Sequence, residues 1–374
     1  MKNKIIERLE FYPVYILFFI SKILPEKTLK KFLRKLSYFV LSIIRNQKNI
    51  AYKNLEIINP EYSEKEKKRI FKKFSYIYGE ILSDQILFPE LTVEKLKNKF
   101  KASGYEYVKK CIDDGKGCII VLGHLGNWEI FGSHASINGI PLNGIYRPLD
   151  NKLLDKFITD FRRNFGLKLI SKFSSPVSMI RPILNKEALC IVSDQNTIRN
   201  YLFVPFFGKI ASASRGFSFF HLKTNCPVFF AYSIIDEKFN QYGYVEKEYD
   251  FASLYENLSY EEKHFLYLFN KTFNSNVIQQ IYKENLKNFS KYYQYEKRFI
   301  KIESKEYYDE IEKFIKNIKK YDELSFDEKS FYITYFFHKS LEKIIKQYPE
   351  NWFLIHPRFN KQPAGFSSVY KSKK

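Results

Sequence analysis

The sequence predicts an α/β fold in which a mostly parallel central sheet is flanked by helices. Residues 117–123 (GCIIVLG) form a short, nearly unbroken apolar run, as expected of a strand that is buried on both faces. Residues 153–166 form an amphipathic helix that stops at a glycine. Further apolar strands alternate with helical segments, which is typical of a parallel sheet. These strands are predicted over residues 167–170, 187–195 and 226–235.

The length and composition allow a large folded core. The chain has 374 residues, enough for one large domain with additions or for two domains. Its hydrophobic content of 45% supports a sizeable core and argues against general disorder. The four cysteines form neither a CxxC pair nor a zinc spacing, so we expect reduced thiols in a cytosolic environment.

The first hundred residues are predicted to be helical and associated with a membrane. Residues 11–20 (FYPVYILFFI) are an apolar run shorter than the ~20 residues that cross a bilayer comfortably. Residues 32–44 are a second apolar-rich stretch, and basic residues flank both. We predict a membrane anchor that either spans the bilayer or lies in its interface, and the alternative is an ordinary amphipathic core helix. No small-residue cleavage site follows, which argues against a removed signal peptide.

The order of predicted helices and strands divides the chain into four regions. A helix over residues 61–82 opens with a capping box, in which Ser63 is followed three residues later by Glu66. Another strongly helical pattern covers residues 302–321. The predicted regions are an N-terminal helical region (1–100), an α/β core (101–235), a helical insertion of unknown role (236–335) and a C-terminal segment that returns to the core (336–374).

The charge is strongly positive. The formal net charge of +21 suits an anionic partner, which is a nucleic acid, an acidic lipid or a phosphorylated substrate. Compositional bias is the alternative explanation, because much of the excess is lysine in a chain rich in lysine, isoleucine, asparagine and tyrosine. The basic residues are spread along the chain, and no RNP, KH or helix-turn-helix signature is present, so we expect no nucleic acid as a partner.

The strand at 118–122 is followed by a histidine and a glutamate, His124 and Glu129. Polar residues just beyond the carboxyl end of a strand form the site in open α/β sheets. A five-residue spacing does not place both side chains on one face of a helix. The two meet only if His124 lies in the turn and Glu129 in the first turns of the next helix, a geometry that Gly123 and Gly126 permit.

Histidine is the natural general base near neutral pH, and a neighbouring carboxylate fixes its tautomer. The chain has no GxSxG nucleophile elbow, so we expect the pair to activate a hydroxyl group of a second substrate. The HExxH pattern is absent, and we expect neither a metal nor another cofactor. A single HxxxxE pattern also arises by chance, and the histidine is then an ordinary loop residue.

The stretch GHLGNWE resembles the bacterial lipid A late acyltransferases (the lauroyl and myristoyl transferases), which share the HxxxxD/E motif of the glycerolipid acyltransferases. Other blocks resemble the same family in the same order. This resemblance implies a glycerolipid-acyltransferase-like sheet with N-terminal membrane-associated helices. The further blocks lie at residues 45–66, 145–163, 193–216 and 349–359.

The resemblance also implies roles for individual residues. His124 would be the general base, and Glu129 would be its partner. Arginine binds phosphate through two hydrogen bonds or stabilises an oxyanion. The alternatives are a solvated helix face for Arg162 and a loop salt bridge for Arg147. The substrate-binding positions that the resemblance implies are Asn127, Arg147, Arg162 and Asp194.

The implied reaction is transfer of a fatty acyl chain from acyl carrier protein to a hydroxyl of a lipid A precursor. The resemblance thus implies a phosphorylated glycolipid acceptor, an anionic membrane surface, and a location on the cytoplasmic face of the bacterial inner membrane. Three alternatives stay open: another glycolipid acceptor such as a phosphatidylinositol mannoside, hydrolysis of the thioester, and a non-catalytic basic protein that binds nucleic acid or membrane.

One departure from the family pattern is a stretch of about a hundred residues (236–335) before the last block. This insertion either covers the site, contacts lipid, binds a partner or is a helical elaboration without its own chemistry.

Overall fold

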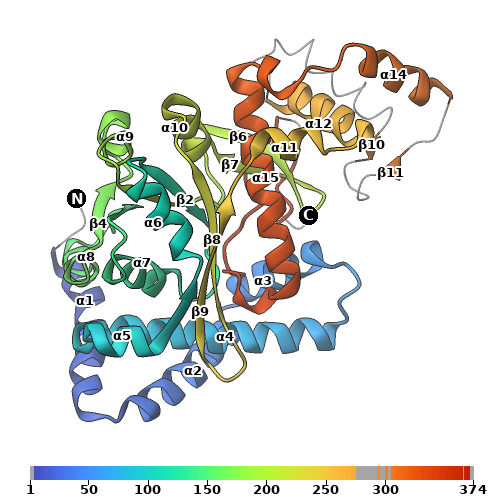
Figure 1. Cartoon of the computed structure of the whole chain (residues 1–374). Helices are drawn as coiled ribbons and strands as arrows, with labels where there is room; N and C mark the ends of the chain where they lie inside the picture. The colour runs from blue at the N-terminus through green and yellow to red at the C-terminus, as the bar shows by residue number, and fades with distance from the viewer. Residues whose placement is uncertain (1–3, 275–292, 295–299, 302–304, 365, 371–374) are drawn as a thin grey trace. The chain divides into compact units, whose positions relative to one another are not determined.

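The computed structural model describes residues 4–274, 293–294, 300–301, 305–364 and 366–370 (Figure 1). The chain divides into two compact units, each assembled from segments that are distant in the sequence. The first unit comprises residues 1–192, 226–248 and 347–356, and the second comprises residues 193–225, 249–346 and 357–374.

The first unit contains a seven-stranded sheet of order β1-β9-β8-β2-β5-β3-β4. Only β8 and β9 pair antiparallel, and the other neighbours in this sheet are parallel. The predicted α/β fold with a mostly parallel sheet is therefore confirmed. The strands are β1 (Phe100–Ser103), β2 (Cys118–Leu122), β3 (Leu142–Tyr146), β4 (Lys168–Ser171), β5 (Ala188–Val192), β8 (Val228–Ile235) and β9 (Gln241–Glu248).

The four strands predicted from apolar runs are present as β2, β4, β5 and β8. Every residue of β2 is buried, which explains its uninterrupted apolar sequence. Leu122, the last residue of β2, lies opposite Val192, the last residue of β5. The two neighbouring parallel strands therefore end at the same edge of the sheet, and the loop that carries His124 starts at this edge.

Three strands of the sheet lack such an apolar run. Strand β9 lies in the region that was expected to be a helical insertion. Its sequence contains many polar residues and therefore lacks the apolar run of a buried strand. Gly243 is required in this strand because a Cβ there would lie 2.6 Å from the ring of Phe100 and 2.7 Å from that of Phe131. Side chains from the sheet and the neighbouring helix thus pack directly on the backbone of β9.

The main core of the first unit packs helices against the sheet. Ile120 and Leu122 of β2 lie in this core together with Ile130 and Phe131 of α7. The helices that surround the sheet are α5 (Val93–Lys99), α6 (Tyr105–Asp113), α7 (Trp128–Ile137), α8 (Lys152–Asn164) and α9 (Pro176–Leu184).

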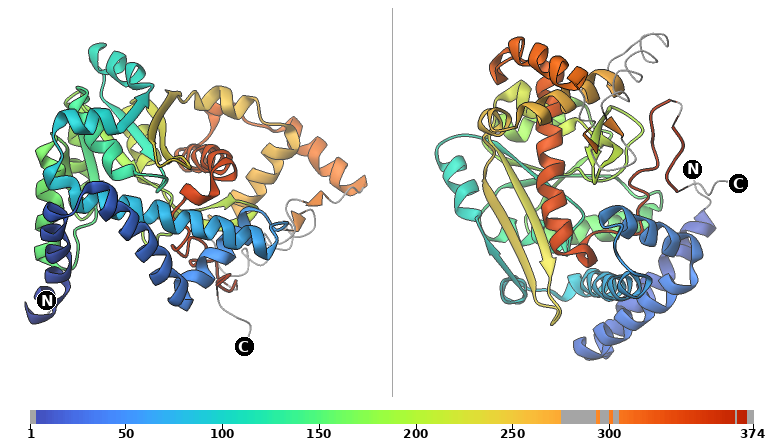
Figure 2. Two further views of the ribbon diagram at one scale, coloured as in Figure 1. Left: turned by 90° about the horizontal axis from the view of Figure 1, so that it is seen from below. Right: turned by 90° about the vertical axis from the view of Figure 1, so that its right-hand side faces the viewer.

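Helices α1 to α4 form the N-terminal part of the chain, and α2 packs along α4 (Figure 2). The predicted capping box of α4 is present, with Ser63 as the N-cap and Glu66 as its partner. The helices of the described residues include none with the combination of length and apolarity that a bilayer crossing requires. The four helices are α1 (Lys4–Ile23), α2 (Glu26–Ile43), α3 (Arg45–Ile58) and α4 (Glu64–Leu87).

The second unit combines a two-stranded antiparallel hairpin with helices. The helix expected over residues 302–321 is present as α14 (Lys305–Lys316), and residues 302–304 lie outside the described part of the chain. The other elements described in this unit are β6 (Tyr201–Phe206), β7 (Lys209–Ser214), α10 (Gly216–Thr224), α11 (Phe251–Glu256), α12 (Tyr260–Phe273), β10 (Tyr293–Gln294), β11 (Ile300–Lys301) and α15 (Phe326–Gln347).

His134 in the core of the first unit makes the stability depend on pH. Its Nδ1 lies 3.0 Å from the Tyr105 hydroxyl. Burial, and then the charge of Lys97, lower the pKa of His134 to about 4. The unfolded chain binds a proton near pH 6.5 while the folded protein does not, so the free energy of unfolding falls by up to ~3 kcal/mol as the pH drops toward 4.

We expect His134→Gln to remove this part of the pH dependence, because the amide keeps a hydrogen-bonding group and does not titrate. Urea unfolding of both proteins at pH 7 and pH 4.5 measures the difference. An equal loss of stability in the two proteins between these pH values would show that His134 does not contribute.

Candidate active site

The candidate site is built on the connection between β2 and α7. We call residues 123–127 of this connection the motif loop. His124 lies in the motif loop, and Glu129 is the second residue of α7. This is the arrangement expected from the five-residue spacing, with the histidine in the turn and the glutamate in the first turn of the helix.

Gly126 gives the motif loop its shape. Its φ is +50°, in the left-handed region that favours glycine. A Cβ at this position would lie 2.6 Å from the carbonyl oxygen of Ser233. The hydroxyl of Ser233 in turn donates a hydrogen bond of 2.6 Å to the carbonyl of Leu125. The loop therefore runs directly against the backbone of β8, and a side chain at position 126 would push it away.

A distant part of the sequence fixes the other side of the motif loop. We call residues 349–356 the closing segment. The amide of Gly126 donates to the carbonyl of Asn351 over 2.9 Å, and the amide of Phe353 donates to the carbonyl of His124 over 3.1 Å. Leu125 and Trp352 form an antiparallel bridge between these hydrogen bonds. The backbone on both sides of His124 is thus held in place.

Two asparagines anchor the closing segment. The side chain of Asn351 accepts from the amide of Ile235 over 2.7 Å and donates to its carbonyl over 3.2 Å. The Asn54 amide group donates to the carbonyls of Leu354 and His356 over 2.7 and 2.9 Å. The blocks at 45–66 and 123–129 and residues 349–356 of the block at 349–359 therefore meet in the first unit.

Aromatic rings surround the imidazole of His124. The centroid of the Trp128 ring lies 5.0 Å away in an edge-on arrangement, and that of the Phe353 ring lies 6.2 Å away. His124 is half-buried, so one part of the imidazole faces these rings while another part stays accessible. An accessible imidazole with an apolar side suits a base that acts on a lipid hydroxyl.

Glu129 binds Arg162 of α8 through two parallel hydrogen bonds. Nε of Arg162 donates to Oε2 over 2.9 Å, and Nη2 donates to Oε1 over 2.7 Å. Both side chains are about four-fifths buried, at 19% and 20% exposure. Arg162 is therefore not a solvated helix residue, and this fork geometry fixes a guanidinium cation beside the first turn of α7.

In the structure the Glu129 carboxylate accepts hydrogen bonds from Arg162. The direct pairing of Glu129 with His124 stays a prediction. The charge of Glu129 also reaches Cys190 of β5. Burial, and then the Glu129 carboxylate, raise the pKa of the Cys190 thiol to about 12. This thiol is therefore neutral at physiological pH.

Asn127 is buried and caps α7. Its Oδ1 accepts from the amide of Ile130 over 3.2 Å. Its Nδ2 donates to Asp84 over 2.9 Å and to Gln241 over 3.1 Å. The polar atoms of Asn127 thus point into the protein and fix the helix start, while its predicted contact with substrate stays untested.

Asp84 of α4 is the centre of a buried polar cluster that pattern reading did not identify. We call Asp84, Asn127, Gln241, Lys30 and Lys99 the Asp84 network. Oδ1 of Asp84 lies 3.3 Å from Nζ of Lys30 and also binds Lys99, while Oδ2 binds Asn127 and Gln241. Burial alone would lower the pKa of the Lys30 ammonium, but the carboxylates of Asp84 and Glu80 outweigh it and raise that pKa.

A signal for this network exists in the sequence. Glu80 and Asp84 stand four residues apart in the amphipathic pattern of α4, and both are buried in the folded protein. Two acids on the apolar face of a helix need buried cations. Lys30 and Arg34 on α2 supply them to Glu80 over 2.6 and 2.7 Å.

Arg147 lies in the loop after β3 and is mostly exposed, with 63% of its side chain accessible. Its Nη2 lies 3.7 Å from Asp150, the loop salt bridge that was the alternative to substrate binding. The structure therefore leaves the guanidinium accessible to an anionic ligand, and its binding role stays a prediction.

Asp194 belongs to the second unit, where it is buried near Arg358 and His338. Burial lowers the pKa of the Arg358 guanidinium to about 10, and the charge of Asp194 opposes this shift. Nη2 of Arg358 lies 2.9 Å from Nε2 of His338. Since burial and the Arg358 charge lower the pKa of His338 to about 3, this imidazole is a neutral acceptor. His338 was not recognised as a polar core residue in the sequence, because an apolar helix pattern surrounds it.

Among the described residues, no three histidine, cysteine, aspartate or glutamate side chains converge in a way that could hold a metal ion. The candidate site in the first unit brings together an imidazole, a carboxylate–guanidinium pair and the N-terminal end of α7.

Comparisons with known proteins identify the family of the chain. A family model described as bacterial lipid A biosynthesis acyltransferase matches residues 3–246. A lipid A biosynthesis acyltransferase of Haemophilus influenzae is 23% identical over 190 residues, which cover 49% of this chain and 58% of the relative. A phosphatidylinositol mannoside acyltransferase of Mycolicibacterium smegmatis is 19% identical over 156 residues, which cover 41% of this chain and 51% of the relative.

The match to the curated relatives thus spans a little over half of their length. The family model covers well over half of this chain and includes the motif loop, α7 and α8. The resemblance stated from the sequence blocks is therefore confirmed, and the chain belongs to the bacterial lipid A biosynthesis acyltransferase family.

Proposed function

We propose that the protein is an O-acyltransferase that moves a fatty acyl chain from acyl carrier protein to a hydroxyl of a lipid A precursor. The observation that carries this proposal is the geometry at the end of β2: a half-buried histidine in a fixed turn, next to a helix start that holds a glutamate–arginine pair. Membership of the lipid A acyltransferase family supports the same reaction.

In the proposed reaction, His124 accepts the proton of the acceptor hydroxyl. The hydroxyl oxygen attacks the thioester carbonyl, and negative charge develops on the carbonyl oxygen. The positive end of α7 and the Arg162 guanidinium stabilise this oxyanion. The carbon–sulfur bond then breaks, and the imidazolium gives its proton to the leaving thiolate. The chain's own residues supply each proton transfer in this scheme.

The charge of the chain suits both proposed substrates. Acyl carrier protein is acidic, and a lipid A precursor carries phosphates. A net charge of +21 favours the association of either with the protein, and exposed Arg147 at the sheet edge is the proposed phosphate ligand. Asp194 is also proposed to contribute to substrate binding.

We propose that α1 and α2 attach the protein to the cytoplasmic face of the inner membrane by lying in the bilayer interface. Leu9, Ile16 and Ile23 lie on the outward stripe of α1 and are 68%, 55% and 82% exposed. Phe32 and Phe39 of α2 are also exposed apolar residues, and lysines stand near them in the sequence. Exposed apolar side chains with flanking lysines are typical of interfacial helices.

A second acceptor is supported by the M. smegmatis relative, whose name gives a phosphatidylinositol mannoside as its substrate. A general base that accepts a proton from a sugar or hydroxyacyl hydroxyl serves both acceptors equally well. Only a comparison of the two lipids as acceptors separates them.

The first prediction for this proposed reaction concerns His124. We expect His124→Ala to lower acyl transfer by ~10²-fold or more, the scale of losing a general base. The measurement is transfer of labelled acyl groups from acyl carrier protein to a purified lipid A precursor in matched membranes. His221→Ala, in the second unit, is the control and should keep the wild-type rate. Equal transfer by wild type and His124→Ala would remove this residue from the mechanism.

The second prediction concerns the Glu129–Arg162 pair. We expect Arg162→Lys to lower kcat by ~10²-fold, because an ammonium cannot form the two parallel hydrogen bonds and moves away from the oxyanion. Glu129→Gln should have a similar effect, and the double variant should be little worse than either single one. Independent, multiplicative losses in the double variant would contradict a shared role.

The third prediction concerns the membrane. The triple variant Leu9→Ser, Ile16→Ser and Ile23→Ser should bind vesicles that contain phosphatidylglycerol at least about tenfold more weakly than wild type. The reason is that three apolar contacts with lipid are lost. Vesicle sedimentation measures this binding, with Tyr260→Ser on α12 as the exposed control. Unchanged binding would exclude the outward face of α1 as the contact surface.

A further inference from the structure

We propose that α1 is a positioning element of the catalytic site, acting on Arg162 through Asn151 and Phe157 of α8. This inference rests on the proposed function, since it assigns an effect on the same transfer reaction. It goes beyond membrane attachment, because the inner face of α1 would determine the reaction rate while the outer face binds lipid.

Asn151 joins the start of α8 to α1 with a single buried side chain. Its Oδ1 caps α8 by accepting from the amides of Leu153 and Leu154 over 3.0 and 3.2 Å. Its Nδ2 donates to the carbonyl of Glu7 over 2.8 Å and to the carboxylate of Glu10 over 3.0 Å. The same side chain therefore fixes the first turn of α8 and ties that turn to α1.

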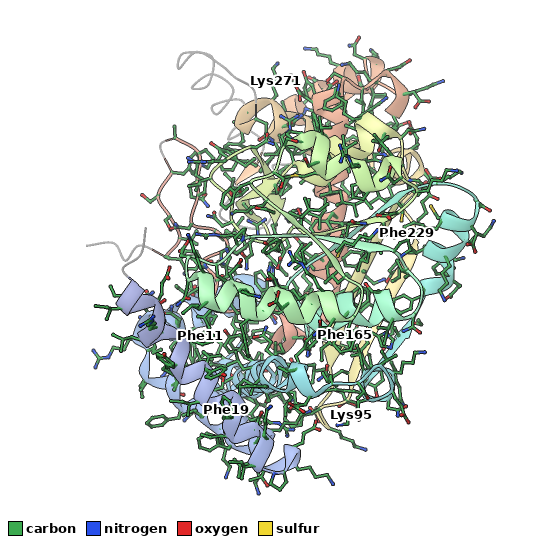
Figure 3. All side chains as sticks on the ribbon, turned by 90° about the vertical axis from the view of Figure 1, so that its left-hand side faces the viewer. Phe11, Phe19, Lys95, Phe165, Phe229 and Lys271 are labelled. Atoms are coloured by element: carbon green, nitrogen blue, oxygen red, sulfur yellow. The ribbon has the colours of Figure 1, made fainter. Side chains whose placement is uncertain are left out.

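Phe157 provides the second link, one and a half turns further along α8. Its ring lies edge-to-face on Phe11, with centroids 6.1 Å apart, and on Phe18, with centroids 5.7 Å apart. Phe11 and Phe18 are two helical turns apart, so Phe157 inserts between them on one face of α1. In Figure 3, α8 runs from beside α1, where Phe11 is labelled, toward the labelled Phe165.

Arg162 follows Phe157 on the same helix and makes the fork with Glu129. Two parallel hydrogen bonds tolerate only small displacements of the guanidinium. A helix of this length moves as a rigid rod, so a shift at Asn151 and Phe157 displaces Arg162. Misplacement of a catalytic group by about 1 Å costs up to ~10²-fold in rate.

The two faces of α1 allow the two effects to be separated. Phe11 and Phe18 are half-buried and face α8, while Leu9 and Ile16 are exposed. Variants of the outward face test membrane binding, and variants of Asn151 or Phe157 test positioning.

The chain contains two tryptophans, and both report on the site. Trp128 packs on the His124 ring, and Trp352 forms the bridge to Leu125. Tryptophan fluorescence of the full chain therefore measures the environment of the motif loop without any need for turnover.

The decisive variant is Asn151→Asp. Aspartate is an equally good helix cap, so α8 keeps its start. It has no amide hydrogens for Glu7 and Glu10, and its charge repels the Glu10 carboxylate. Glu10→Gln in the same chain restores a donor and removes the repulsion. Phe157→Ala and Phe157→Leu form a second pair, in which leucine keeps part of the apolar contact.

We expect Asn151→Asp and Phe157→Ala to lower kcat by about tenfold or more, with KM for the acyl donor within about twofold of wild type. Both should bind vesicles of phosphatidylethanolamine and phosphatidylglycerol like wild type and change tryptophan emission. Adding Glu10→Gln to Asn151→Asp should recover part of kcat, and Phe157→Leu should lose less of kcat than Phe157→Ala. Ile16→Ser is the matched control: it should weaken vesicle binding and leave kcat of the bound enzyme unchanged.

An unchanged kcat in Asn151→Asp, together with loss of transfer in His124→Ala, would overturn the positioning role and leave the proposed function in place. A fall in kcat without recovery on Glu10→Gln would assign the loss to the cap and also overturn the inference. If wild type shows no transfer, the proposed function fails. Tryptophan emission then decides the positioning role, and identical emission in wild type and Asn151→Asp on vesicles would contradict it.

Discussion

The ion pairs and hydrogen bonds of Asp84 are the interaction on which the arrangement of the site depends. One carboxylate binds two lysines, from α2 and α5, with one oxygen and two amide side chains, from the start of α7 and from β9, with the other. A buried carboxylate is stable only while these partners stay in place. The start of the helix that carries Glu129 is thereby fixed to the N-terminal helices, so the motif and α2 and α4 belong to one packed assembly.

The other contacts of the candidate site connect to Asp84 one after another. Asn127 hydrogen-bonds to Asp84 and to the backbone of Ile130, and so fixes the first turn of α7. Glu129 on this turn binds Arg162, and the closing segment fixes the backbone of His124. Asp84 and Asn127 are buried, whereas His124 is half-buried. This order explains why the family motif contains glycine, asparagine and tryptophan as well as the two residues with acid–base chemistry.

Local pattern was sufficient to predict four of the seven strands of the large sheet, the capping box and the position of His124 in a turn before a helix. It was not sufficient to predict which groups pair. Glu129 and Arg162 are 33 residues apart, and Asn127 and Gln241 are 114 residues apart. Such pairings depend on the order of strands in the sheet, which periodicity does not contain. Strand β9 was missed for a related reason, since its pairing with β1 and β8, rather than its composition, makes it a strand.

The closing segment has a consequence for how the protein folds during its own synthesis. Asn54 hydrogen-bonds to Leu354, a partner 300 residues later, and the amide of Phe353 holds the carbonyl of His124. Contacts of this sequence separation form late, because the intervening chain must be ordered first. A nascent chain on the ribosome therefore carries all the residues of the HxxxxE motif long before their loop has its final shape. The hydrogen bond to the His124 carbonyl can form only after residue 353 has left the ribosome, so the backbone around His124 is fixed near the end of protein synthesis.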